Sequence, residues 1–149
     1  MRREKRQIVR GYAQMWSREV FNIKEGRKKG KRLLLSIREL LNGPGIYVLY
    51  RDDHPYYVGK TKNPLFKRIW SHANATRDRY FNFWNFFSAF VVSRKNYIDE
   101  LEGILIAAMP TANSASPKIR KIRIPREVVA LLQSRKTIVY EVRGPNGER

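Results

Sequence analysis

The chain has 149 residues, of which 42% are hydrophobic, and this is enough for one domain with a packed core. Lysine and arginine number 31 against 13 aspartate and glutamate residues, so the formal net charge is +18. Such an excess is far more than solubility requires and indicates a polyanionic partner, with nucleic acid favoured over an anionic membrane surface. The chain has no cysteine, which excludes disulfides, thiolate zinc sites and cysteine nucleophiles.

No stretch of the sequence approaches the roughly 18 apolar residues of a membrane-spanning helix, and no apolar signal region follows the basic N-terminus. We therefore expect a soluble intracellular protein, cytoplasmic or associated with the nucleoid, with no membrane partner. The two histidines are too few for a histidine-rich metal cluster. Any catalytic metal should be a hard cation held by carboxylate and water, such as magnesium.

Apolar residues recur at helical spacing between Gln7 and Ile23, which predicts a first helix despite Gly11. A basic run broken by two glycines follows at residues 24–32 and is typical of a flexible loop. A solvated loop is the plainer interpretation, but the charge density favours phosphate contacts. The candidates for nucleic-acid binding in this run are Arg27, Lys28, Lys29, Lys31 and Arg32. A second helix is predicted over Leu33–Leu41.

Residues 45–61 predict a β-hairpin in which two short strands are joined by an Asp-Asp-His-Pro turn. Because side chains alternate along a strand, Tyr47 and Tyr57 should lie on one face of this hairpin. Gly45 and Gly59 should keep that face open to a partner. Packing of aromatic rings in a core would explain the two tyrosines equally well.

The pair Asn63-Pro64 predicts the N-cap and first position of a helix of roughly a dozen residues. Arg68 and His72 lie four residues apart on this helix, so they project from one face and can reach the same group. Phe86–Val92 is rich in strand formers and predicts a third strand at the centre of the sheet. The aromatic residues around Trp84 are predicted to be core rather than a base-stacking surface.

A helix capped by Asn96 is predicted from about Tyr97 to Met109, and Pro110 ends it. Glu102 falls inside the apolar stripe of this helix, whereas Glu100 is predicted to lie on the protein surface. Burying a carboxylate is costly unless it has a partner or a metal. Glu102 is therefore a candidate metal ligand, although a glutamate in such a stripe more often lies at its edge.

The C-terminal region is basic. A polar loop over 114–117 leads to an alternating basic run at 118–124, then a helix from Pro125 through Leu132 and a strand over Thr137–Val142 are predicted. The candidates for nucleic-acid binding here are Lys118, Arg120, Lys121 and Arg123. The sequence has no internal repeat and no separable second domain, so we expect a single domain over 1–149.

An ordered set of motifs runs through the middle of the chain: Gly45-Ile46-Tyr47, then Tyr57-Val58-Gly59, then Arg68 with His72, then Glu102 and Asn113. On these residues the chain resembles the GIY-YIG nucleases over residues 45–113. The resemblance implies an α+β fold, a small three-stranded sheet flanked by helices. The flanking parts would be an N-terminal helical and basic extension over 1–42 and a C-terminal helix-strand extension over 114–149.

The resemblance also implies roles for these residues. Tyr47 and Tyr57 would position the attacking water and the scissile phosphate, with one phenol a candidate proton acceptor. Arg68 would contact the nonbridging oxygens, where a guanidinium fork suits a phosphoryl group. Glu102 would hold one divalent ion, Mg²⁺ or Mn²⁺, that stabilises the leaving oxygen.

Three further residues would contribute to the site, His72 as a catalytic residue and Lys60 and Asn113 as supporting residues. Lys60 and His72 occupy positions where similar enzymes carry assisting polar or basic groups, and Asn113 would shape the site from behind the helix. Lys67 competes with Arg68 for the arginine position but would face away from His72, so Arg68 is preferred. His54 in the turn is expected to be a surface residue.

Two functions are therefore open. The first is a metal-dependent endonuclease that hydrolyses DNA phosphodiester bonds by water attack. The second is a basic nucleic-acid-binding module that keeps the fold without cutting. In both cases the expected partner is DNA, and RNA is not excluded.

Overall fold

The computed structural model describes residues 7–23, 27–113 and 116–136. A four-stranded antiparallel sheet lies at its centre, in the order β1-β4-β2-β3. The strands are β1 (Val9–Ser17), β2 (Gly45–Arg51), β3 (His54–Thr61) and β4 (Phe86–Val92). The helices are α1 (Arg27–Leu40), α2 (Leu65–Asn74), α3 (Ile98–Ala108) and α4 (Arg126–Ser134), with short 3-10 turns η1 (Arg18–Phe21) and η2 (Lys95–Tyr97).

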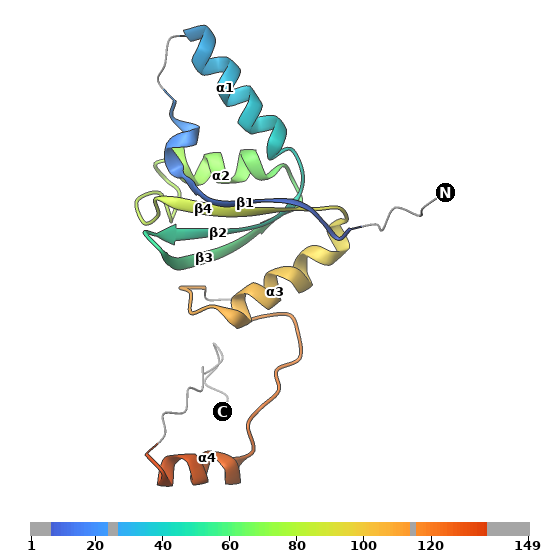
Figure 1. The fold of residues 1–149 in the computed structure, drawn as a ribbon, viewed down its shortest axis with the longest axis vertical. Coiled ribbons are helices and arrows are strands. Elements are labelled where there is room, and N and C mark those ends of the chain that lie inside the picture. The colour runs from blue at the N-terminus through green and yellow to red at the C-terminus, as the bar shows by residue number, and fades with distance from the viewer. Residues whose placement is uncertain (1–6, 24–26, 114–115, 137–149) are drawn as a thin grey trace, which may run out of the picture.

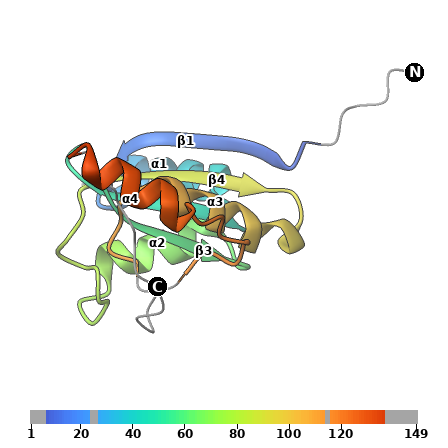
Figure 2. The ribbon, with the colours of Figure 1, turned by 90° about the horizontal axis from the view of Figure 1, so that it is seen from below.

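Helices cover the sheet on both faces. α1 and α2 lie on one face and α3 on the other, as the two views in Figures 1 and 2 show. The main core lies under α2 and includes Tyr47, Leu49, Ile69 and Phe87, each 0% exposed. A smaller cluster around Ile98 lies under α3. In Figure 1, α4 lies beyond α3 and away from the sheet, and none of its residues is buried.

The predicted mixture of helices and sheet is confirmed, but the three-stranded sheet is wrong because β1 adds a fourth strand. The helix predicted over residues 7–23 is likewise wrong, since Val9–Ser17 pairs with β4 and only the short turn η1 follows. The pairing register shifts between Val9 and Gly11 and again between Ala13 and Trp16. Each such bulge displaces the alternation of side chains, which gave the apolar residues an apparent helical spacing.

The loop predicted over 24–32 is also wrong where the structure describes it, because α1 already begins at Arg27. Residues 24–26 lie outside the described residues. The predicted helix over Leu33–Leu41 forms the second half of α1. The three cations at 27–29 lie at the N-terminus of α1, where the helix dipole disfavours positive charge. The sequence of this stretch therefore does not predict the start of a helix.

Predicted helix ends were less accurate than predicted helices. Neither Asn63 nor Asn96 caps a helix through its side chain: Pro64 precedes α2, and η2 precedes α3. The helix predicted after Pro125 is confirmed as α4. The strand predicted over Thr137–Val142, like residues 114–115 of the predicted polar loop, lies outside the described residues.

The hairpin and the central strand are confirmed. β2 and β3 pair antiparallel with Tyr47 opposite Gly59, and β4 lies between β1 and β2. Trp84 is 1% exposed and packs in the core as predicted. Within the part of the chain that the structure describes, no helix combines the length and the apolar character needed to cross a membrane.

Candidate active site

The two signature tyrosines lie on the same face of the hairpin, as their spacing predicts. Their ring centroids are 6.3 Å apart. They differ in exposure: Tyr47 is 0% exposed, while Tyr57 is half-buried on the edge strand β3. Of the two phenols, only that of Tyr57 is therefore placed to meet a ligand without a change in the core.

The neighbouring glycines make room for protein rather than for a partner. A Cβ at Gly59 would overlap the Tyr47 ring, and a Cβ at Gly45 would overlap the carbonyl oxygen of Phe90. The expectation that these glycines keep the face open to a partner is therefore wrong. Gly59 is needed because the Tyr47 ring lies directly across its strand pair.

A chain of hydrogen bonds runs through the buried Tyr47 hydroxyl. The Nε–H of Arg68 donates to this oxygen at 3.3 Å, and Nε2 of His72 lies 2.7 Å from it. Arg68 and His72 thus reach the same group from one face of α2, as their spacing predicts. On its other side, Nδ1 of His72 lies 2.8 Å from Oδ1 of Asp78.

Burial fixes the direction of these bonds. It holds the pKa of His72 below its ordinary value, although Asp78 acts in the opposite direction, so the imidazole is neutral near pH 7. It also raises the pKa of Tyr47 well above the ordinary value of a phenol. Tyr47 therefore donates its O–H to Nε2 of His72, and Nδ1–H of His72 donates to the Asp78 carboxylate.

The lowered pKa of His72 predicts a pH dependence of stability. Below pH of about 6.5 the unfolded chain binds a proton on this histidine while the folded protein does not, so the free energy of unfolding should fall as pH is lowered from about 7.5 to about 5.5. Chemical denaturation across this range measures it. His72→Gln should flatten the profile and His54→Gln, at an exposed histidine, should not. A wild-type profile that rises toward low pH would contradict a neutral His72.

Asp78 was not found by sequence reasoning. It lies between α2 and β4, six residues after His72, and its Oδ1 also accepts a hydrogen bond from the backbone N–H of Tyr80 at 2.9 Å. The Tyr80 ring in turn stacks on Tyr57, with centroids 4.2 Å apart. One carboxylate therefore positions both the histidine behind Tyr47 and the ring beside Tyr57. An acidic residue soon after a helical histidine was the available signal.

Glu102 approaches the same edge strand from α3. Its side chain is 14% exposed, and Lys60 Nζ lies 3.4 Å from Glu102 Oε1 and 2.7 Å from Asp99 Oδ1. Burial raises the pKa of Glu102, while Lys60 lowers it. The position inside an apolar stripe is thus confirmed, and the partner of this carboxylate is Lys60.

Tyr57 lies close enough to Arg68 and Glu102 for both charges to act on its phenol. Burial raises the pKa of its phenol most, and the nearby charges of Arg68 and Glu102 act on it in opposite directions. The half-buried Tyr57 on the edge strand is thus influenced by both a guanidinium and a carboxylate. This combination of charges suits a phosphodiester together with a divalent cation.

The donor set fits one hard cation rather than a cluster. Among residues 7–23, 27–113 and 116–136, no group of three or more histidine, aspartate or glutamate side chains converges on one point. Mg²⁺ usually keeps several waters and is bound through one or two carboxylates together with substrate phosphate oxygens. Glu102 could supply one such carboxylate, and its present partner is Lys60 Nζ at 3.4 Å.

Asn113 fastens the segment after α3 to the edge strand. Its side-chain oxygen accepts from Val58 N at 2.9 Å, and its side-chain nitrogen donates to Val58 O at 2.7 Å. The backbone of the neighbouring Ala112 also donates to Tyr56 O at 2.7 Å. These bonds satisfy the open side of β3 next to Tyr57 and hold the end of α3 against the site.

The predicted nucleic-acid-binding residues form two separate groups. Lys28, Lys29, Lys31 and Arg32 are exposed on α1, and Arg27 begins that helix. The second group, Lys118, Arg120, Lys121 and Arg123, is exposed in the segment that leads from α3 to α4. Figure 1 places the two groups on opposite sides of the sheet, so they do not form one continuous patch.

Comparison with known proteins agrees with the motifs. No curated protein and no solved structure gives a significant match to the chain. A family model described as the GIY-YIG catalytic domain matches residues 43–111, which confirms the resemblance for this part of the chain.

Proposed function

We propose that the protein is a metal-dependent endonuclease that hydrolyses DNA phosphodiester bonds by water attack. The observation that carries the proposal is that the charges of Arg68, on α2, and Glu102, on α3, both act on the half-buried Tyr57 of the edge strand β3. A nuclease needs a cationic group for the phosphate, a carboxylate for a divalent ion and a hydroxyl for the nucleophile. The net charge of +18 supports a polyanionic substrate.

Arg68 would bind the nonbridging oxygens of the scissile phosphate. Its Nε–H is taken by Tyr47, which fixes the plane of the guanidinium and leaves the terminal nitrogens for the phosphate. His72 and Asp78 hold Tyr47 in turn. In this proposal Tyr47, His72 and Asp78 are positioning residues, because they reach the phosphate only through Arg68.

Tyr57 would orient the attacking water. Burial raises the pKa of this phenol, so the hydroxyl is protonated near neutral pH and can accept a hydrogen bond from water while donating one. The Tyr80 ring stacked on it limits its motion. A divalent ion held by Glu102 would supply Lewis-acid stabilisation of the leaving oxygen, and Lys60 would hold the Glu102 carboxylate in place.

The direct test is cleavage with purified protein and Mg²⁺ over a panel of single-stranded, duplex, flapped and branched DNA. We expect cutting of at least one substrate, and loss of cutting when EDTA removes the metal. Absence of metal-dependent cutting across the whole panel would overturn the proposal.

The second candidate is a nucleic-acid-binding module that does not cut. The ion pair between Lys60 and Glu102 favours it, because a lysine already neutralises the carboxylate that an ion would need. This candidate predicts salt-sensitive DNA binding without Mg²⁺-dependent cleavage of any substrate tried.

The two tyrosines should respond differently to loss of their hydroxyls. Tyr57→Phe should lower the cleavage rate by about a hundred-fold, in the range for removing a group that assists proton transfer, with little change in stability. Tyr47→Phe leaves the buried Nε2 of His72 unpaired and removes the acceptor of the Arg68 Nε–H, and it should also cost about 1–3 kcal/mol of stability. Single-turnover cleavage and denaturant unfolding measure both effects. A wild-type cleavage rate in Tyr57→Phe would show that this tyrosine only packs against its neighbours.

A further inference from the structure

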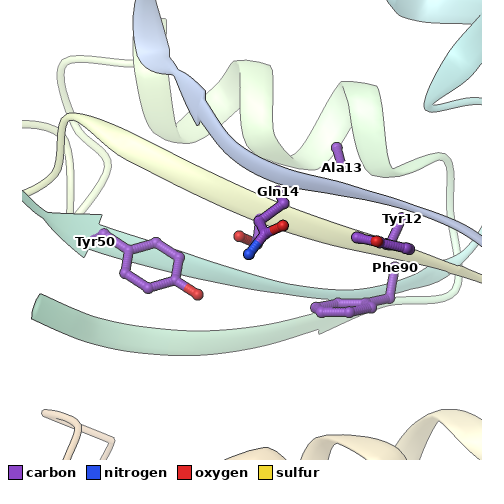
Figure 3. Close-up of a pocket in the computed structure, with 6 residues that line it drawn as sticks. Tyr12, Ala13, Gln14, Tyr50 and Phe90 are labelled. Carbon is purple, nitrogen blue, oxygen red and sulfur yellow. The ribbon is translucent and has the colours of Figure 1, made fainter. Parts of the chain in front are cut away.

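A pocket separate from the candidate active site lies on the α3 face of the sheet, away from Tyr57. It has a volume of about 260 Å³ and is lined by Tyr12, Ala13, Gln14, Tyr50, Ser88 and Phe90. Figure 3 shows Tyr12 and Phe90 at one end, Tyr50 at the other and the Gln14 side chain between them. Helix α3 covers the neighbouring part of this face and leaves the pocket open.

One wall of the pocket is an exposed aromatic stack. The Tyr12 ring lies on the Phe90 ring with centroids 6.2 Å apart and an interplanar angle of 19°. Tyr12 is nevertheless 71% exposed, so its ring contributes little to the core. An exposed ring supported from behind by another ring is a ready surface for stacking a further flat group.

The bulge in β1 supplies polar groups to the same pocket. Between the pairs Ala13–Ala89 and Trp16–Phe87, two residues of β1 lie opposite the single residue Ser88. Within this bulge Met15 has φ of 50° and donates its N–H to Ser88 Oγ at 3.1 Å. A bulge changes the direction of neighbouring side chains, and Gln14 points its amide into the pocket (Figure 3).

The volume and the lining residues of the pocket indicate the class of ligand that fits it. Pockets for drug-sized molecules measure roughly 300–1,000 Å³, so about 260 Å³ suits one planar ring system. A π-face for stacking beside an amide that both donates and accepts hydrogen bonds matches a nucleobase, and glutamine pairs well with the edge of adenine. The basic segment 116–125 leaves the body on this side of the sheet (Figure 1) and offers cations for the attached phosphates.

We propose that this pocket binds an unpaired base of the DNA substrate, stacked on Tyr12. The proposal rests on the proposed function for the identity of the nucleic acid. A base inside a duplex is already stacked and cannot enter, so the pocket would favour DNA with a single-stranded, bulged or flapped nucleotide. Tyr12 and Gln14 lie outside the matched residues 43–111, so this selectivity would come from a strand added to the catalytic domain.

The test uses 2-aminopurine, an adenine analogue whose fluorescence reports stacking, in EDTA so that nothing is cut. The wild-type protein should quench the probe in a single strand or a one-nucleotide bulge, and not in a continuous duplex. Tyr12→Ala should abolish the quenching and weaken binding by about ten-fold, the scale of one base stacked on an aromatic ring. Tyr12→Phe should preserve both. Leu35→Ala, at a 54%-exposed apolar residue on α1, should leave both unchanged.

Quenching by Tyr12→Ala equal to that of the wild type would overturn the proposal. It would mean that no base stacks on Tyr12, as expected if a second copy of the chain or another segment covers the pocket. Equal affinity for the bulged and the continuous duplex would also overturn it. The proposed nuclease function fails separately, when Mg²⁺ produces no cutting although quenching persists. The two proposals are thus distinguished by one set of variants.

Discussion

Replacing Glu102 with glutamine should reduce the rate of DNA cleavage by at least about a thousand-fold while leaving DNA affinity nearly unchanged. Glutamine keeps the shape of the side chain but removes the negative charge that a divalent ion requires. Several kcal/mol of transition-state stabilisation depend on such an ion, and each 1.4 kcal/mol corresponds to about ten-fold in rate. Single-turnover cleavage at saturating Mg²⁺, beside equilibrium DNA binding in EDTA, measures the two quantities.

Two carboxylates on the same helix serve as controls. Asp99→Asn removes the closer partner of Lys60, at 2.7 Å, without touching Glu102, and Glu100→Gln removes an exposed charge. Both variants should retain most of the activity. If Asp99→Asn were as inactive as Glu102→Gln, the essential feature would be the placement of Lys60 rather than the binding of a metal. A wild-type cleavage rate in Glu102→Gln would contradict the proposed mechanism.

Local signals predicted the parts of the fold that depend on short-range chemistry. The hairpin was predictable because turn residues at Asp52 and Asp53 separate two runs of strand formers, and pairing then follows from the turn. β4 was predictable because a dense run of β-branched and aromatic residues suits a strand buried on both faces. These patterns need no knowledge of the rest of the chain.

β1 was missed because its partner is distant in sequence and its alternation is broken. It pairs with β4, which begins 69 residues after the last residue of β1, and its two bulges remove the period of two that marks a strand. Met15 has a positive φ that the residues next to it in the sequence do not predict. Only the assembled sheet, with Ser88 accepting from the backbone of Met15, explains this conformation.

Most residues of the site were predictable from the sequence, but their burial was not. The spacing of Arg68 and His72 fixed a common face of α2, and both do reach the Tyr47 hydroxyl. The burial of Tyr47 depends on the fit of its ring over Gly59 and on the packing of α2 in the same core, and no local pattern reports either. Asp78 lies in an irregular loop, where the direction of a side chain is set by tertiary contacts.

Arg68→Ala should lower the cleavage rate by about a hundred- to a thousand-fold, the range for removing one charged donor to a transition-state oxyanion. Arg68→Lys should rescue little, because an ammonium lacks the planar fork that binds two phosphate oxygens and cannot offer Nε–H to Tyr47. The loss of stability should be small, since Arg68 is exposed and this hydrogen bond is 3.3 Å long. Cleavage at saturating DNA separates the chemical step from binding.

Lys67→Ala is the matched control, because Lys67 is the adjacent exposed cation on α2. Each variant removes one positive charge, so each should weaken DNA binding slightly and to a similar extent, with the salt dependence reduced by about one counterion. Only Arg68→Ala should also slow the chemical step, because Tyr47, held by His72 and Asp78, positions Arg68 and not its neighbour. Equal rates in the two variants would mean that α2 contributes charge without a defined phosphate contact.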